Sequence, residues 1–272
     1  MDEEKNQHII VLTDFTERSC IALDHGIVLA DVLEKELSLL CFAQENEDEN
    51  MLHEKMQAIA KDRKIQLSTY VLKAKYAKAY NELVAESNAI LAIVCFDNTD
   101  SKSNFHPARL LKFFHQSRIP YIFANNAITD ASYYKKIILP IDSTKESKEK
   151  VLWASYFGRF NESELKVMAA SVKDEYLLRQ MNNNLKFIKK IFDSFEVNFE
   201  ILRTTQKQSS IDEAAIHAAA DENAGLVIIL STKSYGILDL LKGPKELGLI
   251  TNEERISIMC LNQRDDLYVM CD

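Results

Sequence analysis

The chain has 272 residues, a net charge of −8, a pI near 5.4, and 47% hydrophobic residues. This length corresponds to about two average domains, and both halves carry enough apolar residues to bury a core. The acidic balance disfavours nonspecific nucleic-acid binding. No apolar run approaches the roughly 20 residues that a membrane helix needs. The polar, acidic start and the five cysteines without a CxxC spacing predict a reduced, cytoplasmic protein without a secretory signal.

The first half alternates short apolar runs with helical patterns. Helix 17–32 follows Thr16, which is a candidate N-cap. Strands are predicted at residues 8–12, 37–43, 66–72, 90–96 and 119–124, and helices at about 17–32, 46–64, 75–87 and 107–116.

The pattern restarts after a polar connector at residues 125–134. Strands are predicted at residues 136–141, 164–170, 197–202, 226–230 and 255–261, and helices at 145–158, 174–195, 210–223 and 244–251. Strands that alternate with helices indicate right-handed crossovers and a parallel sheet covered on both faces. The fold class is therefore α/β, with two tandem doubly wound domains of five strands each.

The opening stretch occurs twice. Residues 9–16 read IIVLTDFT and residues 137–144 read IILPIDST, so Asp14 and Asp142 each follow a buried strand. Open α/β sheets bind ligands at the carboxyl ends of strands, next to the point where the strand order reverses. Either carboxylate could accept hydrogen bonds from a ribose or a base edge, or it could help to cap the helix that follows. The repetition alone leaves both roles open.

The loop after the fourth strand differs between the halves. Residues 230–244 contain two glycines, three Ser or Thr residues and two lysines, which is typical of an anion-binding loop. Residues 96–107 contain no glycine and two acids, which is a poor phosphate site. The sequence has no P-loop, GxGxxG, GxSxG or HExxH motif, so an α/β-hydrolase or a metal site has little support.

The strand-Asp-x-Thr start, the doubled order of elements and the loop after residue 230 together resemble the universal stress protein family in its tandem form. Nucleotide-binding members carry a Gly-x2-Gly-x9-Gly-Ser/Thr loop around the ATP phosphates. Gly243 takes the place of the last glycine, Gly236 matches a glycine often found within the loop, and Pro244 replaces the hydroxyl residue. The first two glycines fall on Leu230 and Lys233. The resemblance implies strand order 3-2-1-4-5 in each domain.

The resemblance also implies a function. Residues 1–128 would form a first domain that does not bind nucleotide, and residues 135–272 a second domain with a partial nucleotide loop. ATP or AMP would bind weakly there, with Asp142 on the base or ribose and Lys233, Ser234, Gly236 and Gly243 facing the phosphates. We expect a non-enzymatic, cytoplasmic stress-response protein without catalytic or metal-binding residues. The alternatives are a weak nucleotide hydrolase, for which Asp239 is the nearby acid, and a ligand-free interaction scaffold.

The partners follow from the same resemblance. The fifth strands would pair within the chain, from Ile119 to Ala124 and from Arg255 to Leu261, and cover two edges that otherwise invite aggregation. The result would be an intramolecular pseudo-dimer, with a homodimer as a further possibility. Neither nucleic acid nor membrane is expected as a partner.

Overall fold

The computed structural model of the protein describes residues 6–44, 46–73, 77–99, 103–232 and 244–263. The chain divides into two compact units, Met1–Ala131 and Ser132–Asp272. Among the described residues, no helix is both long and apolar enough to cross a membrane.

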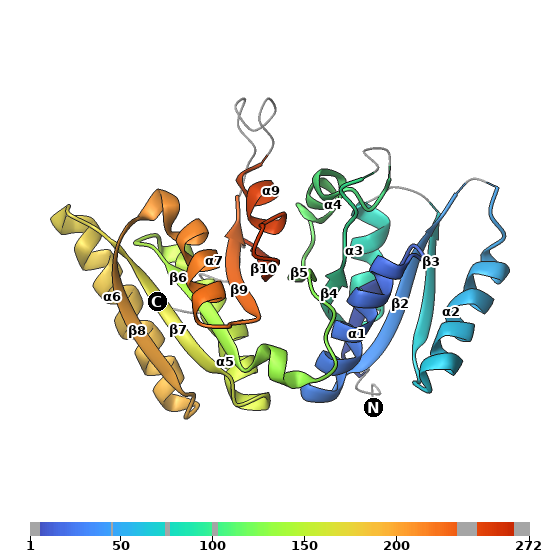
Figure 1. Cartoon of the computed structure of the whole chain (residues 1–272), viewed down its shortest axis with the longest axis horizontal. Coiled ribbons are helices and arrows are strands. Elements are labelled where there is room, and N and C mark those ends of the chain that lie inside the picture. The colour runs from blue at the N-terminus through green and yellow to red at the C-terminus, as the bar shows by residue number, and fades with distance from the viewer. Residues whose placement is uncertain (1–5, 45, 74–76, 100–102, 233–243, 264–272) are drawn as a thin grey trace. The chain divides into compact units, whose positions relative to one another are not determined.

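In the part of the first unit that the structure describes, five strands alternate with four helices (Figure 1). In chain order they are β1 (His8–Leu12), α1 (Glu17–Val32), β2 (Glu36–Ala43), α2 (Glu49–Arg63), β3 (Ser68–Lys73), α3 (Ala77–Glu86), β4 (Ala89–Val94), α4 (Pro107–Phe114) and β5 (Tyr121–Phe123).

The described residues of the second unit repeat the alternation, with short 3₁₀ segments added (Figure 1). Its elements are η1 (Ala131–Tyr134), β6 (Lys136–Ile141), η2 (Lys145–Glu149), α5 (Lys150–Phe160), β7 (Glu164–Ser171), α6 (Glu175–Ser194), β8 (Phe199–Lys207), η3 (Gln208–Ser210), α7 (Ile211–Asp221), β9 (Leu226–Ser231), α9 (Lys245–Ile250) and β10 (Ser257–Asn262).

Both units have the predicted sheet order. In the first unit the order is β3-β2-β1-β4-β5, and in the second it is β8-β7-β6-β9-β10, with parallel pairing throughout each unit. The strand that begins each unit therefore lies in the middle of its sheet, where the strand order reverses. The prediction of two doubly wound α/β domains is confirmed.

Burial along the strands reflects helices on both faces. Every residue of β1 is buried, whereas the edge strand β3 is half-buried or exposed along its whole length. In the second unit, α5 and α7 both contact β6 and β9; α5 also contacts α6, whereas α7 also contacts α9. Right-handed crossovers place the first pair and the second pair on opposite faces. This double cover explains why the central strands are continuous apolar runs.

One glycine in each unit lets a helix approach a neighbouring segment closely, a strand in the first unit and the residue Val197 before β8 in the second. A Cβ atom on Gly26 of α1 would lie 2.3 Å from Val11 Cγ2, and one on Gly158 of α5 would lie 2.3 Å from Val197 Cγ1. Only a residue without a side chain fits at such distances. These two glycines therefore set how closely α1 packs on β1 and α5 packs beside Val197.

The end of the connector is part of the second unit. Tyr134 is fully buried, and its ring centroid lies 5.6 Å from that of Phe157. The Ser163 hydroxyl donates a hydrogen bond of 2.7 Å to the Tyr134 carbonyl. The Tyr133 and Ser257 hydroxyl oxygens lie 3.0 Å apart, and a Cβ atom on Gly225 would lie 2.0 Å from the Tyr133 carbonyl oxygen. The connector thus contributes core and backbone contacts as well as chain length.

Three details differ from the sequence-based expectations. Thr16 occupies the N-cap position of α1, but its side chain makes no capping hydrogen bond because it donates to Asp14 instead. Helix 145–158 begins as the 3₁₀ segment η2. Strand β8 extends to Lys207, five residues beyond its predicted end. The expected pairing of β5 with β10 concerns the two units relative to one another and stays a prediction.

Candidate functional site

Each unit places an aspartate at the carboxyl end of its central strand. Asp142 directly follows β6, which lies between β7 and β9. Asp14 follows β1 by one residue, and β1 lies between β2 and β4. Both carboxylates therefore stand where doubly wound sheets bind ligands.

The two aspartates make the same local hydrogen bonds. Oδ1 of Asp142 accepts from the Thr144 backbone N–H at 2.9 Å and from the Thr144 hydroxyl at 2.6 Å. Oδ1 of Asp14 accepts from the corresponding groups of Thr16 at 3.1 and 2.6 Å. This Asx turn orients the residue that precedes each helix. It occupies one carboxylate oxygen, and Oδ2 accepts no hydrogen bond from a described residue.

The loop after β6 is held by a buried and a half-buried side chain from elsewhere in the second unit. Nδ2 of Asn184, on α6, donates to the carbonyls of Asp142 at 3.0 Å and Thr144 at 2.7 Å. Oε1 of Gln208 accepts from the backbone N–H of Ser143 at 2.7 Å and from its hydroxyl at 2.6 Å. The Asp142 carboxylate is therefore presented on a rigid support. The Ser143 donors are already engaged.

A buried carboxylate occupies the end of β9. Oε1 of Glu246, on α9, accepts hydrogen bonds from the Thr232 hydroxyl at 2.6 Å and from the Thr232 backbone N–H. Glu246 is only 2% exposed, and its Oε2 atom has no hydrogen-bond partner among the described residues. A negative group thus covers a backbone donor that an incoming anion could otherwise use.

A buried lysine lies beneath the same edge of the sheet. Lys150, the first residue of α5, donates from Nζ to the Pro140 carbonyl, and burial lowers the pKa of its amine. The charges of Asp212 and Asp142 act in the opposite direction. Asp212 also forms an ion pair of 2.7 Å with Lys245. Burial likewise raises the pKa of the nearby Cys260 thiol well above its usual value. These groups stabilise the edge internally, since the Lys150 amine is buried and the Lys245 amine is paired with Asp212.

The predicted phosphate-facing residues lie outside the described part of the chain. These are Lys233, Ser234, Gly236 and Gly243. Of the predicted contacts, the structure places Asp142 alone, at the expected strand end. Asn184, Gln208 and Glu246 were not predicted, because each acts from a position far along the chain from the loop that it contacts.

The first unit has a cavity of about 350 Å³ beside Asp14. Its polar lining includes Asp14, Gln44, Glu47 and Asn104, and no described residue of the lining is basic. Cys41 also lines it; burial, followed by the charge of Glu47, raises the pKa of this thiol to about 11. Asp14 and Glu47 make the lining unfavourable for phosphate, and Lys55, whose amine lies 5.6 Å from the Phe15 ring centroid, offsets part of this negative charge.

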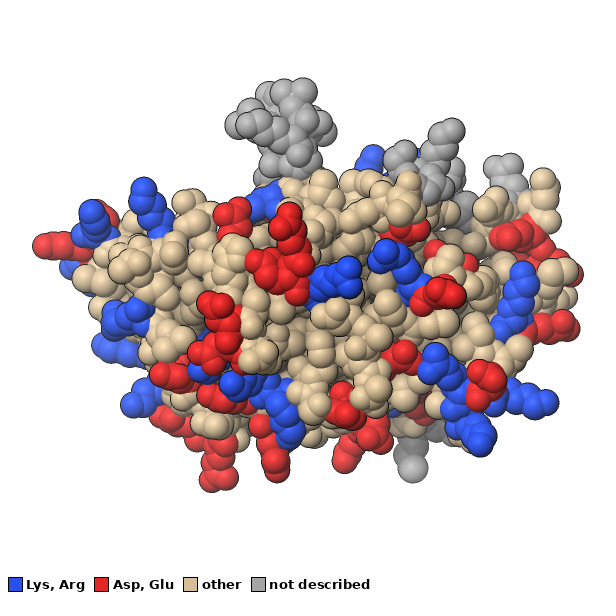
Figure 2. Space-filling model, viewed as in Figure 1, with Lys and Arg blue, Asp and Glu red and all other residues tan. Residues whose placement is uncertain are grey.

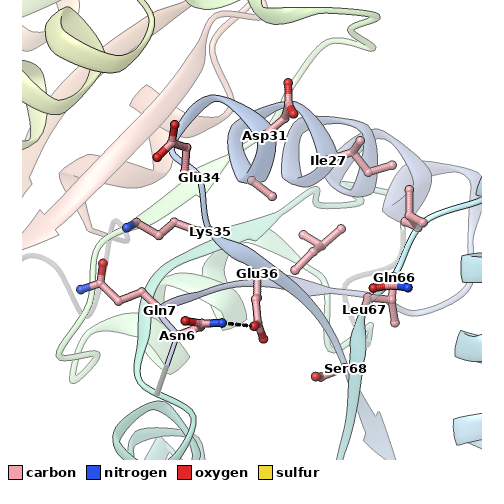
Figure 3. A pocket seen from close by; sticks show the side chains of 13 residues that line it. Asn6, Gln7, Ile27, Asp31, Glu34, Lys35, Glu36, Gln66, Leu67 and Ser68 are labelled. Atoms are coloured by element: carbon pink, nitrogen blue, oxygen red, sulfur yellow. Dashed lines mark hydrogen bonds between the residues drawn. The ribbon is translucent and has the colours of Figure 1, made fainter. Parts of the chain in front are cut away.

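A larger open cavity of about 870 Å³ lies at the opposite edge of the first sheet, where the strands begin (Figure 3). It lies between the end of α1 and the segment that precedes β3. Nδ2 of Asn6 donates a hydrogen bond of 2.5 Å to Glu36, and His8 lies 3.1 Å from the same carboxylate. None of the predicted ligand-contacting residues lines this cavity.

The described Lys and Arg side chains do not gather apart from Asp and Glu on the surface visible in Figure 2. On the face drawn in Figure 2, the described Lys and Arg side chains are interspersed with Asp and Glu. Among the described residues, no three His, Cys, Asp or Glu side chains lie close enough to hold a metal ion. The described residues therefore form a doubly wound protein in which each unit has an aspartate at the carboxyl end of its central strand. In the first unit a cavity lies beside this aspartate.

Comparison with known proteins finds similar folds among solved structures. No protein-family model and no curated protein matches the chain. Solved structures do match: a universal stress protein from Archaeoglobus fulgidus has a TM-score of 0.65 at 13% identity, covering 95% of this chain and 97% of the other. A putative universal stress protein from Pseudomonas aeruginosa has a TM-score of 0.64 at 12% identity, covering 97% and 95%.

A third similar structure is the cytoplasmic domain of a prokaryotic cation chloride cotransporter. Its TM-score is 0.52 at 12% identity, and the match covers 97% of this chain and 99% of that domain. At such low identity these similarities establish the fold alone. The chain has the tandem fold of universal stress proteins, as the sequence predicted.

Proposed function

We propose that this chain is a non-enzymatic, cytoplasmic stress-response protein of the universal stress type that binds an adenine nucleotide weakly in its second unit. In this proposal Asp142 accepts a hydrogen bond from the ribose or the base, and Lys233, Ser234, Gly236 and Gly243 face the phosphates. The observation that carries it is the position of Asp142. It stands at the switch point of a universal-stress fold, on a rigid loop, with one carboxylate oxygen uncommitted to a described residue.

The weakness follows from the groups around Asp142. The Ser143 donors are used by Gln208, and the Thr232 donors by Glu246. A phosphate near Thr232 must either displace this carboxylate or tolerate its charge, and like charges at close range disfavour binding. AMP is therefore expected to bind at least as tightly as ATP.

Calorimetry with ATP, ADP and AMP tests the proposal. The Asp142→Ala variant should lose at least about tenfold in affinity, since a hydrogen bond to a charged group contributes roughly 1.5–3 kcal/mol and every 1.4 kcal/mol is a factor of ten. Asp14→Ala is the matched control, because it removes an Asx turn of the same geometry from the first unit. Its affinity should stay at the wild-type value.

Two results would overturn the proposal. One is the absence of any heat or thermal shift at millimolar nucleotide, and the other is an equal loss of affinity in both variants. A mass spectrum of the supernatant from denatured protein supplies an independent check, since a ligand carried through purification would appear there.

The second candidate is an interaction scaffold without a ligand in the second unit. Glu246 favours it, because the carboxylate already satisfies the donors at the end of β9. The fold similarity to a cotransporter's cytoplasmic domain is compatible with this role. Failure to bind any nucleotide would support the scaffold. Phosphate release from ATP that is abolished by Asp239→Asn would instead support a hydrolase.

A further inference from the structure

Next to the cavity beside Asp14, a second cavity lies between the end of β2 and α4. Its volume is about 440 Å³, within the range of small-molecule sites. Phe42 and Asn104 line both this cavity and the one beside Asp14. The two cavities are thus neighbours with different linings.

Aromatic rings form the wall of this second cavity, which we call the α4 cavity. The centroids of Phe42 and Phe113 lie 5.2 Å apart in an edge-to-face contact. Phe113 also packs on the buried Tyr80 at 5.0 Å, and Phe42 lies 6.5 Å from Phe105. Leu110 adds an aliphatic wall that is 1% exposed. Because Phe42 and Phe113 are only half-buried, they present apolar surface that a ligand could cover.

The rim of the α4 cavity is positively charged and polar. Arg109 and Lys112 come from α4, Gln116 follows that helix, and Asn104 precedes it. The spacing of three or four residues places Arg109, Lys112 and Phe113 along one side of α4. None of the described residues that line the cavity is acidic. The rim therefore favours an anionic group above an apolar wall.

We propose that the α4 cavity binds a small amphiphilic monoanion, such as a carboxylate on an aliphatic or aromatic body. The body covers Phe42 and Phe113, while Lys112 and Arg109 attract the carboxylate. The neighbouring cavity, lined by Asp14 and Glu47, repels the same headgroup and so fixes its orientation toward α4. This site is separate from the nucleotide site proposed in the second unit.

Isothermal titration of the full chain with decanoate tests the assignment, with decanol and decylamine as neutral and cationic probes of the same chain length. Decanoate should bind most tightly and decylamine least. The Lys112→Glu variant should weaken decanoate binding by about fivefold or more, because it replaces an attractive charge by a repulsive one. Lys112 is exposed, so this change should leave folding intact.

Lys78→Glu is the matched control. Lys78 is an exposed lysine on the neighbouring helix α3, and it does not line the α4 cavity. Its replacement should leave decanoate affinity unchanged, as should Asp142→Ala in the second unit. Equal affinity for the three probes, an equal loss in both lysine variants, or no binding of decanoate would each overturn the assignment.

Discussion

His25 provides a quantitative test of how burial controls stability in the first unit. This side chain is 0% exposed within α1, and its Nε2 atom lies 2.7 Å from the Asn126 carbonyl oxygen. Burial lowers the pKa of the imidazole from 6.5 to about 4, and the hydrogen bond to Asn126 offsets part of that effect. The folded protein therefore holds His25 neutral at pH values where the unfolded chain protonates it.

Protonation of His25 should lower the free energy of unfolding at acidic pH. Because the folded pKa lies below the unfolded pKa, the unfolded state binds more protons between about pH 6.5 and pH 4. Stability should fall as the pH falls through this window and should be fully present above it. At 1.36 kcal/mol per pH unit, the His25 contribution amounts to about 3 kcal/mol.

Urea unfolding followed by circular dichroism at neutral pH and near pH 4.5 measures this loss in the wild type and in His25→Gln. The glutamine keeps an amide donor near Asn126 but does not titrate, so this variant should lose roughly 2–3 kcal/mol less than the wild type over the same interval. His217→Gln is the control, since the His217 side chain is 70% exposed. Parallel pH profiles for wild type and His25→Gln would refute the reasoning.

Two further pairs of variants test packing and loop support. Gly26→Ala should destabilise the protein by about 1–3 kcal/mol because its Cβ would collide with Val11. Gly248→Ala, whose Cβ would meet no atom within 4 Å, should stabilise α9 by about 0.5–1 kcal/mol. Thermal denaturation measures both variants, and equal effects would contradict the packing argument. Asn184→Ala should cost about 1–3 kcal/mol because it removes a buried donor from the carbonyls of Asp142 and Thr144. The exposed Asn183→Ala should have little effect in the same assay, and a similar loss in both would rule out the loop-support role.

Most of the fold could be predicted because local patterns determine it. Fully apolar runs such as β1 and β6 need cover on both faces, and the alternation with helices leaves few topologies. The duplicated strand and aspartate predicted the two units as well. The least accurate strand was the edge strand β8, whose exposed residues lack the apolar pattern that marks a buried strand.

The candidate site was less predictable because its hydrogen bonds join distant segments. Glu246 reaches Thr232 across 14 positions, and Asn184 reaches Asp142 across 42. Such contacts follow from tertiary packing, and residue type alone does not indicate them. The α4 cavity was missed for the same reason, since Phe42 joins Phe113 only after the sheet and helix have packed.

The buried Tyr134 affects how the second unit should be produced alone. A fragment that begins at residue 135, where the polar connector ends in the sequence, lacks this ring and the carbonyl that receives the Ser163 hydroxyl. Loss of a buried aromatic side chain typically costs about 3–5 kcal/mol, a large part of the stability of a single domain. A fragment cut at Ser132 retains both Tyr134 and the Tyr133 contact with Ser257. Core packing therefore favours a fragment that begins at Ser132, three residues before the end of the polar connector would suggest.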